Sequence, residues 1–335
     1  MKDIFILGIE SSCDETSVSI VKNGNEEIKT IVLSQIDIHK QFGGVVPEVA
    51  SRHHVQNITI ILEELFEDIN YTMEDITAIA VTNGPGLNGC LLVGLEFAKA
   101  LSFVYNKPLV PVNHMAGHIY ASNLETTITY PAVSLVISGG HTDLVYIKEE
   151  LDFKIMGSTL DDAVGECFDK VAKVLGLDYP GGPILDKISK NGTHEYELPM
   201  PLNDNSYNFS FSGLKSKIVN MVHNAKQKGD TINIENMAYD FSNVVVKSLL
   251  KKTIKLIEDK NVKTLVLAGG VSANTLIRSE FLKLEDTLGI KVIIPAFRYC
   301  TDNATMIAIV GYLLYNKNRF GDYKTNVNPN LSIEE

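Results

Sequence analysis

Two stretches of the sequence share one pattern and decide the fold: IFILGIESSCDETSVSIVK at residues 4–22 and AVSLVISGGHTDLVYIK at residues 132–148. In each, an apolar run leads into a turn of small and polar residues, and a second apolar run follows. Such a pattern predicts a β-hairpin. Because it occurs twice, we expect a duplicated chain whose two turns aim backbone N–H groups at a phosphate chain across a cleft. Either turn alone would also fit an ordinary hairpin.

Strand and helix patterns alternate along the rest of the chain, which indicates an α/β fold. We expect a helix from about Pro47 and another starting near Thr275, and the remaining elements at 76–82 (strand), 90–105 (helix) and 237–258 (helix). The polar, turn-rich residues 189–213 predict a long surface loop. A length of 335 residues favours two domains of about 150 residues each.

Composition indicates an ordinary globular protein, since 45% of the residues are hydrophobic and 21% are charged. The N-terminus lacks the pattern of a signal peptide. The longest apolar run, 306–315, is about half of a membrane-spanning helix. We therefore expect a cytoplasmic protein without a membrane segment. Its four cysteines form no Cys-x-x-Cys pair, so we expect reduced thiols rather than a zinc knuckle or disulfides.

The net charge of −11 opposes unaided binding of nucleic acid, because the summed field repels phosphate. A local basic surface or a partner would have to overcome it. One expected helix carries four lysines that present either a solvated face or a surface for RNA or a partner: Lys247, Lys251, Lys252 and Lys255.

Two histidines have the spacing of metal ligands. His114 and His118 lie at i and i+4, on one face of a helix. Met115 stands where a zincin needs its glutamate, which disfavours a metalloprotease. Asp302 offers a third ligand, and two imidazoles with one carboxylate leave positions open for substrate, as in non-haem iron or catalytic zinc sites. Histidines that merely pack in the core are the alternative.

Two glycine-rich stretches call for different interpretations. GPGLNG at 84–89 matches a dinucleotide fingerprint, but no acidic residue follows about 20 positions later. We expect a turn where backbones pass closely. LVLAGGVSAN at 265–274 is a buried strand that ends in two glycines before a helix, where open α/β sheets bind ligands. The Asn274 amide would either bond a nucleotide or cap that helix.

Eight motifs, in order along nearly the whole chain, resemble the TsaD family of tRNA threonylcarbamoyl transferases. They are GIESSCDETS (8–17), NGPGLNGCLLVG (83–94), NHMAGH (113–118), VISGGHTDL (136–144), FDKVAKVLGLDYPGGP (168–183), FSFSGLKS (209–216), AGGVSAN (268–274) and YCTDNATMIA (299–308). The TDNA form of the last motif resembles the bacterial type. Ala116 departs from the acidic residue that is frequent in bacterial relatives.

The resemblance implies a two-lobed actin-like ATPase fold of the actin/sugar-kinase/Hsp70 superfamily, with a nucleotide cleft between duplicated lobes. We place the lobes at 1–128 and 129–325, followed by a polar tail at 326–335.

The resemblance also implies roles for individual residues. The metal ligands would be His114, His118 and Asp302, which hold one divalent metal per subunit, Fe(II) or alternatively Zn(II). The second phosphate loop would be Val136, Ile137, Ser138, Gly139 and Gly140, and the adenylate would contact Asp169, Gly182, Asp186 and Asn274. Asp14 and Glu15 would be the catalytic acidic residues.

The implied reaction moves the threonylcarbamoyl group from threonylcarbamoyl-adenylate to the N6 amine of adenosine-37 in tRNAs that read codons beginning with adenine, and releases AMP. The implied partners are a dimerising paralogue and a small ATPase. A sugar or carboxylate kinase and a nucleotide-sensing module of the same superfamily are the rivals. Neither needs the histidine pair, so metal content and consumption of the adenylate discriminate between them.

Overall fold

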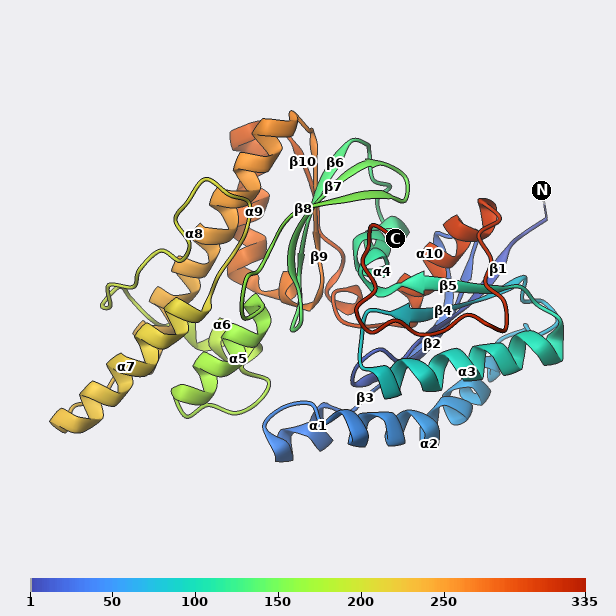
Figure 1. The fold of residues 1–335 in the computed structure, drawn as a ribbon, viewed down its shortest axis with the longest axis horizontal. Coiled ribbons are helices and arrows are strands. Elements are labelled where there is room, and N and C mark those ends of the chain that lie inside the picture. Colours follow the sequence, from blue (N-terminus) through green and yellow to red (C-terminus); the bar gives the residue numbers. More distant parts are fainter. Residues whose placement is uncertain (1) are drawn as a thin grey trace. The chain divides into compact units, whose positions relative to one another are not determined.

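The computed structural model describes residues 2–335 and divides them into two compact units. One unit contains the chain up to Thr127 together with Pro295–Glu335, and the other contains Ile128–Ile294. Each unit has one five-stranded mixed sheet flanked by helices (Figure 1). The expected α/β class is confirmed.

The two sheets have the same topology, which confirms the duplication. The strand orders are β3-β2-β1-β4-β5 and β8-β7-β6-β9-β10. In each, a hairpin and a third antiparallel strand are extended by two parallel strands. The strands are β1 (Phe5–Glu10), β2 (Glu15–Lys22), β3 (Glu26–Ser34), β4 (Ala78–Gly84), β5 (Leu109–Asn113), β6 (Ala132–Ile137), β7 (Thr142–Glu149), β8 (Asp152–Ser158), β9 (Thr264–Ala268) and β10 (Lys291–Ile293).

Helices cover both faces of the first sheet because alternate residues of its strands point to opposite sides. Leu7 and Ile9 of β1 share a core with α2, whereas Gly8 meets α10. The helices of this unit are α1 (Ile36–His39), α2 (Pro47–Phe66), α3 (Asn88–Tyr105), α4 (His114–Tyr120) and α10 (Ala304–Asn316), with 3-10 turns η1 (Lys40–Phe42), η2 (Ala121–Leu124) and η4 (Phe297–Tyr299).

Residues 295–335 pack with the first unit, whereas we expected 295–325 in the second lobe and 326–335 in a polar tail. The apolar helix α10 covers β1, β2 and β4. Beyond it, the Asn328 N–H donates to the Asn83 carbonyl at 2.8 Å, and the Gly86 N–H donates to the Pro329 carbonyl at 3.1 Å. A Cβ at Gly86 would lie 2.7 Å from the Ser12 carbonyl oxygen, so backbones do pass closely at the 84–89 turn.

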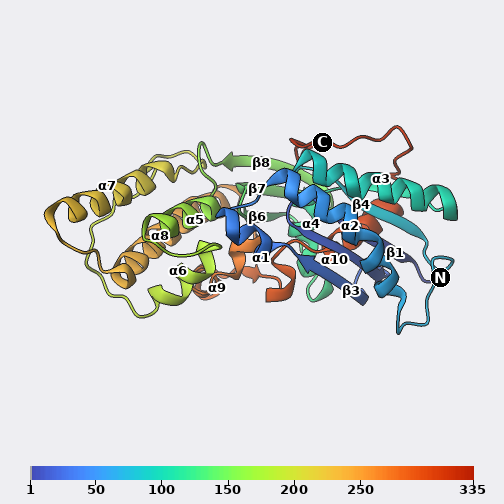
Figure 2. The ribbon, with the colours of Figure 1, turned by 90° about the horizontal axis from the view of Figure 1, so that it is seen from below.

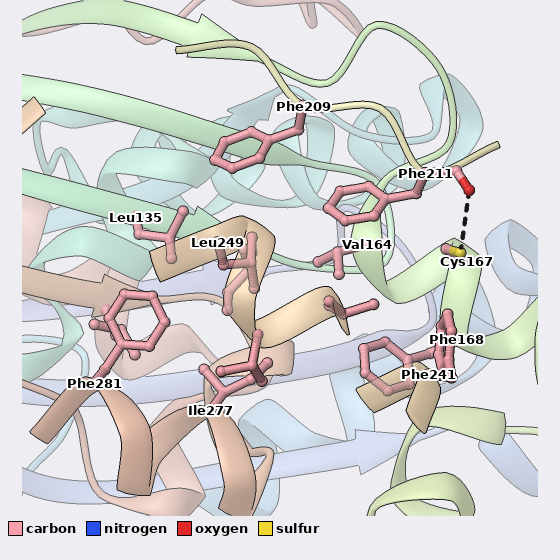
Figure 3. Close-up of a cluster of buried hydrophobic side chains, with 14 of the residues drawn as sticks. Leu135, Val164, Cys167, Phe168, Phe209, Phe211, Phe241, Leu249, Ile277 and Phe281 are labelled. Carbon is pink, nitrogen blue, oxygen red and sulfur yellow. Dashed lines mark hydrogen bonds between the residues drawn. The ribbon is translucent and has the colours of Figure 1, made fainter. Parts of the chain in front are cut away.

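The second unit packs its helices around an aromatic-rich core (Figure 3). The rings of Phe168 and Phe241 lie 5.0 Å apart, and the Cys167 thiol donates to the Phe211 carbonyl. All four cysteines of the chain are free thiols. The helices here are α5 (Val164–Val174), α6 (Gly181–Ser189), α7 (Ser212–Lys228), α8 (Ile234–Lys260) and α9 (Thr275–Leu288), with the 3-10 turn η3 (Gly270–Ala273).

The segment between α6 and α7 has neither helix nor strand, as expected, but two buried side chains of α8 hold it in place. The Asp240 carboxylate accepts from the backbone N–H groups of Glu195 and Tyr196. The Lys252 ammonium donates to the backbone carbonyls of Asp204 and Ser206 at 3.0 and 2.8 Å. Lys252 therefore does not belong to a solvated face.

Among the helices of residues 2–335, none combines the length and the apolar character that crossing a bilayer requires.

Candidate metal centre and nucleotide turns

The histidine pair opens a short buried helix in the first unit. The Asn113 side chain caps α4 by accepting from the N–H groups of Met115 and Ala116. This cap starts the helix at His114 and so places His118 one turn later on the same face. The two imidazole rings lie 4.6 Å apart, centroid to centroid, and nearly perpendicular.

Asp302 joins the pair from the other end of the chain. It stands just before α10, whose start is capped by the Asn303 side chain. Its Oδ1 lies 3.1 Å from His118 Nε2 and 3.5 Å from His114 Nε2. Ligand atoms from all three residues lie within 4.8 Å of one another, in a group that could hold a metal ion. The structure thus brings together the three residues that the sequence singled out.

His118 supports a metal rather than a packing role for this cluster. Its side chain is 1% exposed, yet neither ring nitrogen has a hydrogen-bond partner among residues 2–335. The Nε2 atom lies close to Asp302 without the geometry of a hydrogen bond. Because a buried polar atom is normally satisfied, this unpaired nitrogen fits a ligand to a cation. Two imidazoles and one carboxylate are a donor set for iron or zinc.

Glu10, at the end of β1, is a residue of the site that the sequence analysis missed. It is fully buried, and its Oε2 accepts from His114 Nδ1 at 2.9 Å and from the Thr82 hydroxyl at 2.7 Å. Its Oε1 accepts from the Ser12 N–H. Burial alone would lower the pKa of His114, but the carboxylates of Glu10 and Asp302 outweigh it and raise that pKa to about 9. The available signal was a charged residue that closes an otherwise apolar strand.

Asp14 and Glu15 lie where the first hairpin turn enters β2, and both belong to the same electrostatic cluster. Burial raises the pKa of Glu15 well above its usual range, and the charges of Asp302 and Asp14 add to the effect. His54 of α2 holds this turn by bonding the Cys13 carbonyl and the Thr16 hydroxyl. A bound cation would relieve the repulsion among these carboxylates.

The second hairpin turn is open and glycine-rich. The Ser138 hydroxyl oxygen accepts from the N–H groups of Gly140 and His141, which fixes the turn after Val136 and Ile137. Gly139 and Gly140 are exposed, and a Cβ on either would meet nothing within 4 Å. The backbone here is accessible to an anion.

The second glycine pair lies beside this turn because β6 and β9 are parallel neighbours. Gly269 has a φ of +86°, and a Cβ there would lie 2.4 Å from the Ile137 carbonyl oxygen. Both turns thus follow the carboxyl ends of adjacent strands, where α/β sheets bind ligands.

The remaining predicted nucleotide residues cluster at two helix starts in the second unit. Asp169 Oδ1 accepts from the N–H groups of Gly181 and Gly182 at the start of α6. Asp186 accepts from the Thr275 hydroxyl at 2.9 Å, which joins α6 to α9. Asn274 Oδ1 accepts from the Ile277 N–H at 3.0 Å. Asn274 is therefore the helix cap that we had considered, and its contact with a nucleotide stays a prediction.

Comparisons with known proteins give consistent results. The family model described as TsaD, tRNA N6-adenosine threonylcarbamoyltransferase, matches residues 26–309. The protein of that name from Staphylococcus carnosus (strain TM300) is 52% identical over 335 residues, which is 100% of this chain and 98% of the relative. The one from Staphylococcus aureus (strain JH9) is 50% identical with the same coverage.

Solved structures of lower identity share the fold. HypF from T. kodakarensis has a TM-score of 0.62 at 15% identity, over 95% of this chain and 48% of that one. Component A of the (R)-2-hydroxyglutaryl-CoA dehydratase from Acidaminococcus fermentans has a TM-score of 0.54 at 17% identity, over 92% and 98%. These similarities support the two-lobed actin-like ATPase fold, and at this level of identity they do not indicate a function.

Proposed function

Because the chain belongs to the TsaD family of tRNA N6-adenosine threonylcarbamoyltransferases, we propose that it moves the threonylcarbamoyl group from threonylcarbamoyl-adenylate to the N6 amine of adenosine-37 in tRNA. The tRNAs would be those that read codons beginning with adenine. The observation that carries this proposal beyond the family name is the cluster of His114, His118 and Asp302, with its unpaired buried imidazole. A kinase or a nucleotide sensor of the same superfamily has no use for it.

The three residues would hold one divalent metal per subunit, Fe(II) or alternatively Zn(II). When bound, such an ion supplies a Lewis acid and a template for the oxygens of the donor. Glu10 orients His114 toward it through Nδ1.

The nucleotide part of the donor would bind to the second unit. The exposed backbone of Ser138, Gly139 and Gly140 would receive the phosphate, and Asp169, Gly182, Asp186 and Asn274 would line the adenosine. The short, open turn and the two helix starts support this assignment.

In the reaction, the N6 nitrogen attacks the carbonyl carbon of the mixed anhydride and forms a C–N bond. The bond from that carbon to the phosphate oxygen breaks, and AMP leaves with the electron pair. The N6 nitrogen must lose a proton, and Asp14 or Glu15 would accept it. The raised pKa of Glu15 favours proton uptake by this group.

Partner proteins and location complete the proposal. A chain of net charge −11 needs help to recruit tRNA, so a dimerising paralogue and a small ATPase would assist it in the cytoplasm. We expect the isolated chain to modify tRNA slowly when supplied with adenylate, and the partners to restore full turnover.

Three single variants test the metal assignment: His114→Ala, His118→Ala and Asp302→Ala. Each should lose bound metal by elemental analysis and lose transfer to tRNA, while circular dichroism stays near that of the wild type. His53→Ala, on the half-buried part of α2, is the matched control and should keep both. Unchanged metal content with intact modification in any one variant would remove that residue from the site.

A further inference from the structure

Helix α7 of the second unit is a cationic element in an acidic chain. Its sequence, SGLKSKIVNMVHNAKQK at 212–228, contains four lysines and no aspartate or glutamate. Lys215 pairs with Asp162. The other three are exposed and have no ion pair within residues 2–335: Lys217, Lys226 and Lys228. Their positive charge is therefore available to a ligand.

Exposed lysine and asparagine side chains recur along one face of α7. Lys217, Asn220, Asn224 and Lys228 are separated by three or four residues, so they form one line on the helix, which we call the α7 stripe. Leu214, Ile218 and Val222 are buried on the other side. At about 1.5 Å per residue, the Cα atoms of the two lysines of the stripe lie roughly 16 Å apart along the helix axis. Ammonium and amide groups at such spacing are the donors that proteins offer to a nucleic acid backbone.

The start of α7 is tied to the same end of the sheet as the nucleotide turns. The Asp161 carboxylate accepts from the N–H groups of Phe211 and Ser212 at 2.7 and 3.2 Å. The segment that carries Asp161 is in turn held by Thr142, the residue that follows the Ser138–His141 turn in β7. From there α7 runs away from the sheet to the far end of its own unit, as both ribbon views show (Figures 1 and 2). The stripe thus leads away from the predicted adenylate site.

Helix stability alone does not account for this pattern. Lysines near the C-terminus, such as Lys226 and Lys228, are favoured by the helix dipole, but Lys217 near the positive N-terminal end is not. A helix that is merely solvated usually mixes both signs of charge. Asn224 and Lys228 of the stripe also line a hollow of about 540 Å³, where Glu195 and Asp230 would repel phosphate.

We propose that the α7 stripe binds the phosphate backbone of the tRNA whose adenosine reacts at the adenylate. The proposal rests on the tRNA-modifying function and is independent of the metal site. The lysines that would recruit tRNA belong to a nearly neutral unit, because residues 128–294 contain 19 lysines and arginines against 21 acidic residues. The rest of the chain carries most of the net charge of −11.

The test compares two double variants that remove the same charge from exposed lysines. The first changes the two lysines of the stripe (Lys217→Gln, Lys228→Gln), and the control changes two lysines elsewhere in the unit (Lys263→Gln, Lys291→Gln). Binding of the full chain to unmodified tRNA is measured by fluorescence anisotropy over a series of salt concentrations, along with binding of AMP and metal content.

We expect the α7 variant to bind tRNA at least tenfold more weakly at low salt than the control does. The slope of log K against log salt should become shallower by about 1.4 to 1.8, since each of the two lost phosphate contacts removes about 0.7 to 0.9. AMP binding and metal content should not change. Equal loss in both variants, or loss in neither, would overturn the proposal. Wild-type protein that binds tRNA but transfers nothing, even with partners, would instead refute the transferase function.

Discussion

Replacing Glu10 by glutamine should weaken metal binding without unfolding the protein. The carboxylate accepts three hydrogen bonds, from Ser12 N–H, the Thr82 hydroxyl and His114 Nδ1. Because Oε2 accepts from Nδ1, neutral His114 carries its proton there, and the Nε2 lone pair faces Asp302. Glutamine has one amide oxygen and one NH2 group, so one side of the site loses its acceptor. If the NH2 group faces His114, the imidazole must move its proton to Nε2, where a metal would bind.

The size of the effect follows from these contacts. Loss of a partner that orients a ligating histidine costs about 10-fold to 100-fold in metal affinity. One unmet buried donor costs about 1–3 kcal/mol of folding stability, which most domains tolerate. At neutral pH a second effect has the opposite sign. The pKa of His114 is about 9, so a metal must displace a proton below that pH. Removing the Glu10 charge eases that competition.

The assay is therefore a chelator competition at two pH values. Above pH 9 His114 is neutral in the wild type, and Glu10→Gln should show the full loss of about 10-fold to 100-fold. At pH 7 the loss should be smaller. Thr82→Val is the matched control, because it removes a bond to the same Oε2 but leaves the bond to His114 intact. Wild-type affinity of the Glu10 variant above pH 9 would refute this role of Glu10.

Three further outcomes can be checked by denaturation and binding. Lys252→Met leaves the backbone carbonyls of Asp204 and Ser206 without their donor, so urea unfolding should report a stability loss of about 1–3 kcal/mol. Gly269→Ala forces an L side chain to a φ of +86° and against the Ile137 carbonyl, so we expect a loss above about 2 kcal/mol together with weakened AMP binding. Asn274→Ala should cost about 1 kcal/mol as a lost helix cap. It should also weaken AMP binding in a titration with metal content unchanged, and equal affinity would leave the residue as a cap alone.

The hairpins and the longest helices could be predicted from the sequence because their signals are local. Apolar residues in β1 and β6 and the proline at position 47 mark elements regardless of distant neighbours, and α2 does begin at Pro47. The third strand, β3, was not predicted because it is half-exposed and its apolar residues do not alternate with polar ones. The return of residues 317–335 to the first unit could not be foreseen either. Most of those bonds join backbone groups, which leave no pattern in the sequence, and the Asn113 side chain donates only to backbone carbonyls of the segment, such as that of Ser332.

The metal cluster was accessible in part. The spacing of His114 and His118 is a local feature, whereas their meeting with Asp302 depends on how α10 crosses the first sheet. Glu10 was out of reach for the same reason. Glu10 can orient His114 only because β4 and α4 place Thr82 and His114 within hydrogen-bond distance of its carboxylate.

The lysines of α7 and α8 show why charge patterns need a tertiary context. On sequence alone α8 was the candidate basic surface, since Lys247, Lys251, Lys252 and Lys255 lie within three turns. In the folded chain, however, three of these four are occupied: Lys251 bonds Asn203, Lys252 anchors the 204–206 segment, and Lys255 pairs with Asp259. No acidic side chain approaches Lys217, Lys226 or Lys228 in this way within residues 2–335. An unpaired lysine can neutralise a phosphate, and the counterions that are then released favour binding. We therefore expect α7, rather than α8, to contact the nucleic acid.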